Sequence, residues 1–249
     1  GITNNGTFTA GTGVNNFSTN SQTLTGSFTI PSVSVNGAAV VLTNTNTLTV
    51  NTALGGTGRI TQGAGATLDI GGASAITNMT ATATGNTVNY TGAGQTIKNV
   101  NYENLGLSGS GIKILQVGTN SITGNLDLGG SVSITAVTDL TIGGNVTLGN
   151  GTGFTAGSFT HTVGGNWTNN GSSFVETGST IVLNGAGQTI GGSSSPFNNL
   201  SFTGSGIKVL GVSTAISSTF SVGTGVVADL GSFTSHTANI LVLGGAVQP

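Results

Sequence analysis

The sequence contains no cysteine. It can therefore form no disulfide, no thiolate metal site and no catalytic thiol. The absence of disulfides does not exclude secretion, because a long repeated core can stabilise a surface protein without them. Cysteine content thus excludes several kinds of chemistry but leaves the compartment open.

Charge is almost as scarce, since Asp, Glu, Lys and Arg make up only 4% of the 249 residues and the net charge is -2. The four basic residues are Arg59, Lys98, Lys113 and Lys208, and they never cluster along the chain. Nucleic-acid binding needs clustered cations that neutralise phosphates, so we predict no nucleic-acid partner.

Long apolar runs are missing too. No segment approaches the roughly 18 to 20 continuous apolar residues that cross a bilayer, so we predict no membrane span. The sequence opens on Gly1 without an initiator Met or a basic, leucine-rich signal. We therefore expect an excerpt or a mature form of a longer secreted chain.

The chain is instead rich in glycine, with 45 residues, and in Thr, Asn and Ser. Gly interrupts nearly every window in which a helix could form, whereas short alternating apolar pairs recur along the chain. Examples are Leu68 with Ile70, Val88 with Tyr90, and Ile112 with Ile114. Each pair is expected to place two apolar side chains on the buried face of a short strand.

A repeat of about twenty residues indicates how these strands are arranged. Gly-Asn followed by an apolar residue occurs at Asn125, Asn145 and Asn166, and the apolar residues that follow are Leu126, Val146 and Trp167. We predict an all-β fold, a parallel β-helix (β-solenoid) with coils of about 20 residues and a single domain over residues 1–249. Tandem antiparallel β-sandwiches are the alternative.

Stacked coils bring equivalent residues together. We therefore expect Asn125, Asn145 and Asn166 to form a structural ladder at a corner, where the neighbouring glycines allow a left-handed backbone. We expect the residues after them, Leu126, Val146 and Trp167, to form a core stack.

A longer duplication overlies the short repeat. Thr91–Ile97 is echoed by Asn184–Ile190, and Gly109–Leu115 by Gly204–Leu210. The offset grows from about 93 to about 95 residues between the two blocks, and neither value is a whole number of coils. We expect the insertion at 191–196, which is Ser-rich and ends in proline, to be a surface loop.

The sequence of residues 157–171, together with those of Gly185–Ile190 and Phe197–Phe202, resembles repeat-rich bacterial surface proteins of the filamentous-haemagglutinin-like or autotransporter type. The resemblance covers most of residues 84–215. It implies secretion to the bacterial cell surface, a β-helical architecture and a structural or adhesive role. It identifies no functional residue and no ligand.

Residues that could carry chemistry stand alone. Asp127 and Asp139 are the nearest acids and are expected on different faces, whereas His161 and His236 lack a partner at metal-ligand spacing and are expected to face solvent. We therefore predict no catalytic residue, no metal site, no cofactor and no enzyme activity. A polysaccharide-active β-helix enzyme is the least favoured alternative.

The predicted function is a structural extracellular fibre, stalk or sheath subunit that assembles into a filament through β-edge or end-to-end stacking. The segment 239–245, which we expect to be an apolar, uncapped edge, strengthens this hypothesis. The alternative is an adhesin module that binds a host surface or a polysaccharide, for example through the loop at 191–196.

Overall fold

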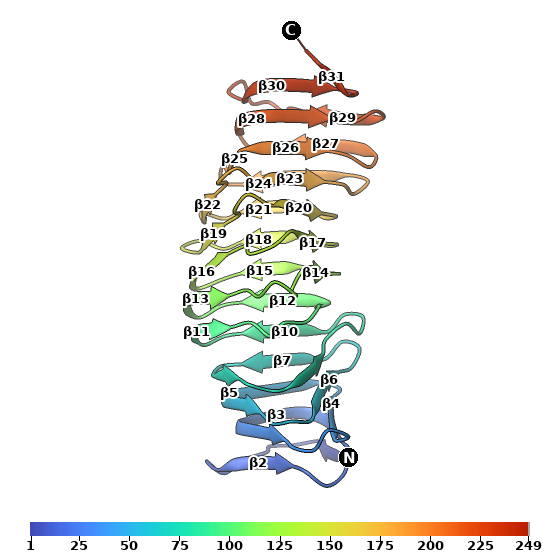
Figure 1. The fold of residues 1–249 in the computed structure, drawn as a ribbon, viewed down its shortest axis with the longest axis vertical. Helices are drawn as coiled ribbons and strands as arrows, with labels where there is room; N and C mark the ends of the chain where they lie inside the picture. The colour runs from blue at the N-terminus through green and yellow to red at the C-terminus, as the bar shows by residue number, and fades with distance from the viewer. Residues whose placement is uncertain (249) are drawn as a thin grey trace. The chain divides into compact units, whose positions relative to one another are not determined.

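The computed structural model describes residues 1–248, which form strands, turns and bends but no helix. It follows that none of the described residues belongs to a helix that could span a membrane. The chain divides into two compact units, Gly1–Thr119 and Asn120–Pro249. Each unit is a stack of coils whose strands pair in parallel with those of the next coil (Figure 1).

The first unit contains thirteen strands: β1 (Ile2–Asn4), β2 (Val14–Phe17), β3 (Gln22–Val35), β4 (Val41–Asn44), β5 (Thr47–Gly55), β6 (Arg59–Gln62), β7 (Thr67–Ile70), β8 (Ala73–Ser74), β9 (Asn78–Thr80), β10 (Thr87–Tyr90), β11 (Ala93–Thr96), β12 (Asn104–Leu107) and β13 (Ser110–Ile114). One core row runs through five coils by register, from Phe28 through Leu48, Leu68 and Val88 to Leu105. All five side chains are buried.

The second unit contains β14 (Ser121–Ile122), β15 (Leu126–Leu128), β16 (Ser131–Thr135), β17 (Leu140–Ile142), β18 (Val146–Leu148), β19 (Gly153–Thr155), β20 (Thr160–Val163), β21 (Trp167–Asn169), β22 (Ser173–Val175), β23 (Thr180–Leu183), β24 (Gln188–Gly192), β25 (Pro196–Phe197), β26 (Asn199–Phe202), β27 (Gly206–Leu210), β28 (Ala215–Val222), β29 (Val226–Asp229), β30 (Thr237–Leu243) and β31 (Ala246–Val247). Each of its first three coils gives one strand to each of three parallel ladders.

The predicted fold class is therefore confirmed, and the antiparallel sandwich alternative is not what forms. β30 and β31 pair antiparallel at the end of their sheet. Parallel pairing follows from the repeat, because each coil leaves its apolar face open until the next coil covers it. The prediction of a single domain over 1–249 is not tested by the division into two units.

Coil length varies along the chain. Most register partners are 19 to 21 residues apart, such as Thr141 with Thr162 and Val182 with Ser201. Val88, however, pairs with Leu105 only 17 residues later. In this short coil the register of β10 with β12 is continuous, whereas that of β11 with β13 shifts between Ala93 and Gln95.

Candidate functional site

The Asn ladder residues lie one above another at a corner of the second unit. Asn125 Oδ1 accepts a hydrogen bond from the backbone N–H of Asn145 at 2.8 Å, and Asn145 Oδ1 accepts one from the N–H of Asn166 at 2.8 Å. Asn166 Oδ1 in turn accepts from the N–H of Thr189 at 2.8 Å. Each side chain thus binds the backbone of the following coil at a turn where strand pairing stops.

The glycines before these asparagines are required for close approach, and the expected left-handed backbone at them was wrong. Neither Gly144 nor Gly165 is among the glycines with positive φ. A Cβ on Gly144 would lie 2.4 Å from Asn125 Oδ1, and one on Gly165 would lie 2.5 Å from Asn145 Oδ1. Glycine leaves the space that the side chain of the previous coil occupies.

The core stack residues lie in one row, since Leu126 pairs with Val146 and Val146 with Trp167. Each is 1% exposed. The row continues through Ile190 to Leu210. The Trp167 ring contacts three phenylalanine rings in the core, those of Phe154, Phe174 and Phe197.

The segment 191–196 is not simply a surface loop. Ser195 is fully buried, and its Oγ accepts hydrogen bonds from Trp167 Nε1 and Asn169 Nδ2, both at 3.1 Å. Gly192 to Ser194 and Pro196 are exposed. The insertion therefore helps to satisfy a buried indole N–H, which otherwise would cost free energy in the core.

His161 was expected to face solvent, and this was wrong. It occupies the core row of Leu140 and Ile181 and is 1% exposed. Its Nδ1 accepts a hydrogen bond from the Leu140 N–H at 3.3 Å, so Nε2 carries the proton donated to Ala156 O at 2.8 Å. Burial lowers the pKa of His161, an effect that the Ala156 hydrogen bond and the charge of Asp139 oppose.

His236 makes the same pair of contacts at a half-buried position, with Thr214 N at 3.2 Å and Leu230 O at 2.9 Å. Asp139 Oδ1 accepts from Thr160 N, whereas Asp127 lies on β15 with an exposed side chain. Among residues 1–248, no three His, Asp or Glu side chains gather as metal ligands would.

Two buried lysines were missed by sequence reasoning. Ile112 and Ile114 were expected to face the core, yet they are 63% and 53% exposed, and Lys113 between them is 0% exposed. Lys208 is buried in the same way beside the exposed Ile207. The strand face is therefore inverted relative to its hydrophobic pattern.

A glutamine explains each inversion. Lys113 Nζ donates to Gly92 O and to Gln95 Oε1, and Gln95 Nε2 donates to Ile70 O at 2.8 Å and Gly72 O at 2.7 Å. We call this arrangement the Gln95–Lys113 corner. It ties three successive coils of the first unit together through one buried carboxamide.

The second copy of the long duplication builds the same arrangement. Lys208 Nζ donates to Gly185 O and Gln188 Oε1, and Gln188 Nε2 donates to Val163 O and Gly165 O. Burial lowers the pKa of Lys113 to about 8 and also lowers that of Lys208. The duplicated Gly-Gln and Ile-Lys motifs were visible in the sequence and were the available signal for these corners.

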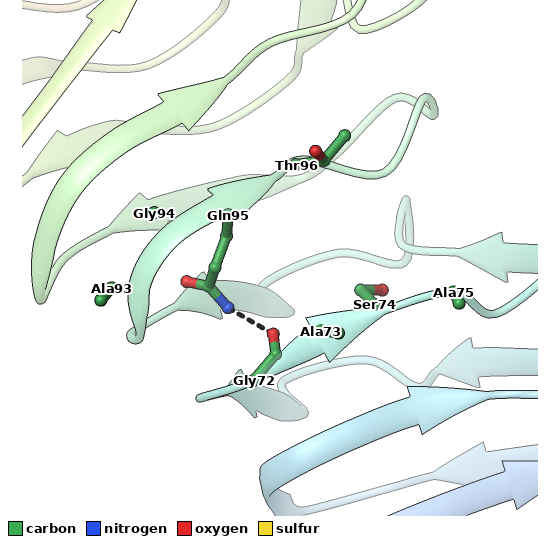
Figure 2. A pocket seen from close by; sticks show the side chains of 8 residues that line it. All are labelled: Gly72, Ala73, Ser74, Ala75, Ala93, Gly94, Gln95 and Thr96. Atoms are coloured by element: carbon green, nitrogen blue, oxygen red, sulfur yellow. Dashed lines mark hydrogen bonds between the residues drawn. The ribbon is translucent and has the colours of Figure 1, made fainter.

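A hollow lies beside the Gln95–Lys113 corner. It has a volume of about 390 Å³ and is lined by Gly72–Ala75 on one side and Ala93–Thr96 on the other. Figure 2 shows the two segments facing each other, with the Gln95 amide bonded to Gly72 O. We call it the β8–β11 slot. Its lining consists of small neutral residues together with Gln95, and its side-chain polar groups are those of Ser74, Gln95 and Thr96.

No protein-family model, no curated protein and no solved structure matches the chain.

Proposed function

We propose that this chain is a structural module of an extracellular fibre, stalk or sheath on a bacterial surface, and that it assembles by adding a second copy to the end of its coil stack. The proposal is supported by the kind of molecule that stacked coils make. Neighbouring coils are held together by the hydrogen bonds of parallel ladders and by packing of their apolar side chains. The same interactions can continue from one copy to the next.

The single observation that carries the proposal is the exposed row of apolar side chains on β30. Leu241 and Leu243 lie in register over Phe220 and Val222, which are each 7% exposed. Leu241 and Leu243 themselves are 37% and 43% exposed. A hollow of about 240 Å³ adjoins Leu241 and is lined mainly by apolar side chains.

The edge of β30 is partly capped, contrary to expectation. After a turn at Gly244 and Gly245, Ala246 and Val247 fold back and pair antiparallel with Leu243 and Val242. Gln248 N also donates to Leu241 O at 2.8 Å. β31 pairs with backbone groups of β30 but leaves the apolar side chains of β30 exposed. It therefore hinders pairing of another strand with this edge more than it hinders burial of these side chains by a second copy.

The first coil offers a compatible surface. Its strands β1 and β2 both pair with β3, and none of the described strands lies on their other edge. Ile2 and Val14 are 41% and 66% exposed there. Phe8 packs edge-on against the core residue Phe28 while remaining 39% exposed.

The test compares assembly of the wild-type chain with that of a Leu241→Lys variant, by sedimentation velocity and negative-stain microscopy. We expect filaments from the wild type and folded monomers from Leu241→Lys, because a charge in the exposed apolar row of β30 opposes burial. The matched control is Val137→Lys, at an apolar residue that is 38% exposed away from β30, and it should assemble normally. A monodisperse wild type, or equal assembly by Leu241→Lys, would contradict the proposal.

A further inference from the structure

The β8–β11 slot is bounded by two strand edges that do not pair with each other. Leu54 is the register partner of Ser74, and the Ala75 N–H donates to Leu54 O at 2.8 Å. In a parallel ladder this places the N–H and C=O of Ser74 on the opposite edge, facing the slot.

The same reasoning applies to the other side. Ile114 is the register partner of Thr96, and the Ile97 N–H donates to Ile114 O at 2.9 Å. The N–H and C=O of Thr96 therefore also face the slot. Two donors and two acceptors of the backbone thus face one hollow, Ser74 being half-buried and Thr96 exposed, and a ligand in the hollow can bond to them.

The second copy of the duplication shows what chemistry satisfies these groups. Gly72 O accepts a hydrogen bond from Gln95, and Gly165 O accepts one from Gln188, the equivalent glutamine of the second copy. Ala73 therefore corresponds to Asn166, and Thr96 to Thr189. In the second copy Asn166 Oδ1 accepts the Thr189 N–H at 2.8 Å, and Trp167 pairs with Ile190. In the first copy Ala73 has no carboxamide and Ser74 stands in place of the tryptophan.

The shape of the slot selects for a compact ligand. Gln95 bridges to Gly72 O at 2.7 Å and closes one end, so an extended peptide strand cannot run through (Figure 2). The volume of about 390 Å³ falls within the range of small-molecule sites. The lining carries no charged side chain, and the nearby Lys113 ammonium is already bonded to Gly92 O and Gln95 Oε1. A neutral ligand fits best.

We propose that the β8–β11 slot binds the acetamido group of an N-acetylated sugar. The acetamido carbonyl oxygen takes the place that Asn166 Oδ1 has in the second copy and accepts the Thr96 N–H. The acetamido N–H donates to Ser74 C=O, and its methyl group lies against Ala73 and Ala93. Ring hydroxyls are left to bond with the remaining backbone groups and with water.

This inference does not depend on the proposed assembly, because the slot lies within the first unit and uses no residue of β30. Its test is titration of the isotope-labelled full chain with N,N′-diacetylchitobiose and, separately, with cellobiose, which lacks the acetamido groups. We expect diacetylchitobiose to bind with a dissociation constant of about 1 mM and to shift the amide resonances of Ser74 and Thr96. Cellobiose should cause no shift at these positions.

Two variants and one control keep the test specific. Ala73→Asn supplies the carboxamide that the second copy already has, and Ala93→Leu fills the slot with a side chain. Each should weaken diacetylchitobiose binding at least tenfold. Ala53→Asn, at the register partner of Ala73 one coil away, should leave binding unchanged.

Thermal melting of each variant separates loss of binding from loss of fold. Equal binding of both disaccharides, absence of shifts at Ser74 and Thr96, or undiminished binding by folded Ala73→Asn and Ala93→Leu would each overturn the proposal.

Discussion

At the scale of single residues, His161 shows how a core position can be misread from its chemical type. The strand His161-Thr162-Val163 repeats Leu140-Thr141-Ile142, so the register places the imidazole in the same core row as Leu140 of the previous coil. Histidine is intermediate between the buried and the exposed residue types, so its chemical type gives no signal of burial. Both ring nitrogens of His161 form hydrogen bonds with backbone groups, which compensates for the burial of the imidazole.

Because burial lowers the pKa of His161 below its ordinary value of 6.5, the unfolded chain takes up the proton more readily than the folded chain. The stability that the neutral imidazole contributes is therefore complete above pH 6.5 and is lost as the pH falls below it. We expect the free energy of unfolding, measured by urea titration, to decrease from pH 7 to pH 5.

A His161→Asn variant should be less stable than the wild type at pH 7 and should show a smaller decrease on acidification. A wild type whose stability is the same at both pH values, or a variant with an undiminished decrease, would contradict this account of His161.

At the scale of strands and turns, the Asn ladder shows how side chains stabilise the corners between parallel strands. Replacing Asn145 with alanine removes the acceptor of the Asn166 N–H. We expect this change to lower the free energy of unfolding by about 1 kcal/mol, the usual value of one hydrogen bond. Asn145→Asp keeps an acceptor oxygen and should lose less.

Chemical denaturation of both variants beside the wild type measures the difference. If Asn145→Ala and Asn145→Asp were equally stable, the Oδ1 acceptor would not be what stabilises the corner.

Periodicity predicted the strands and their parallel stacking, because alternation and a twenty-residue repeat reflect burial and register directly. It failed at β13 and β27, where Lys113 and Lys208 point inward and the neighbouring isoleucines point out. The cause is a glutamine on another coil, Gln95 or Gln188, whose carboxamide receives the ammonium. Such a contact depends on which coil lies above which, and a local pattern does not contain that information.

The β8–β11 slot was not predictable for a related reason. It arises where Ala73 and Ser74 replace the Asn-Trp pair of the second copy, and nothing in those small residues marks an unpaired edge. Only the comparison of the two copies in three dimensions identifies the missing carboxamide and the missing strand pairing.

At the scale of the whole molecule, the two units use one principle of construction. Each buries its apolar residues only by stacking coil on coil, and each leaves Thr, Ser and Asn on the outer surface. Stability is then carried by nearest-neighbour interfaces between coils, as in other solenoid proteins. The proposed assembly extends that principle from one copy to the next.

The central claim is that successive coils pair in parallel and in register, and the lack of cysteine in the chain makes it directly testable. Thr162 on β20 is the register partner of Val182 on β23, whereas Thr180 lies two residues earlier on the same strand. Oxidation of a Thr162→Cys/Val182→Cys variant should give a disulfide within the chain in high yield, because register partners lie within disulfide reach. The Thr162→Cys/Thr180→Cys variant should cross-link far less. Equal cross-linking of the two variants, or preferential cross-linking of the displaced pair, would contradict in-register stacking.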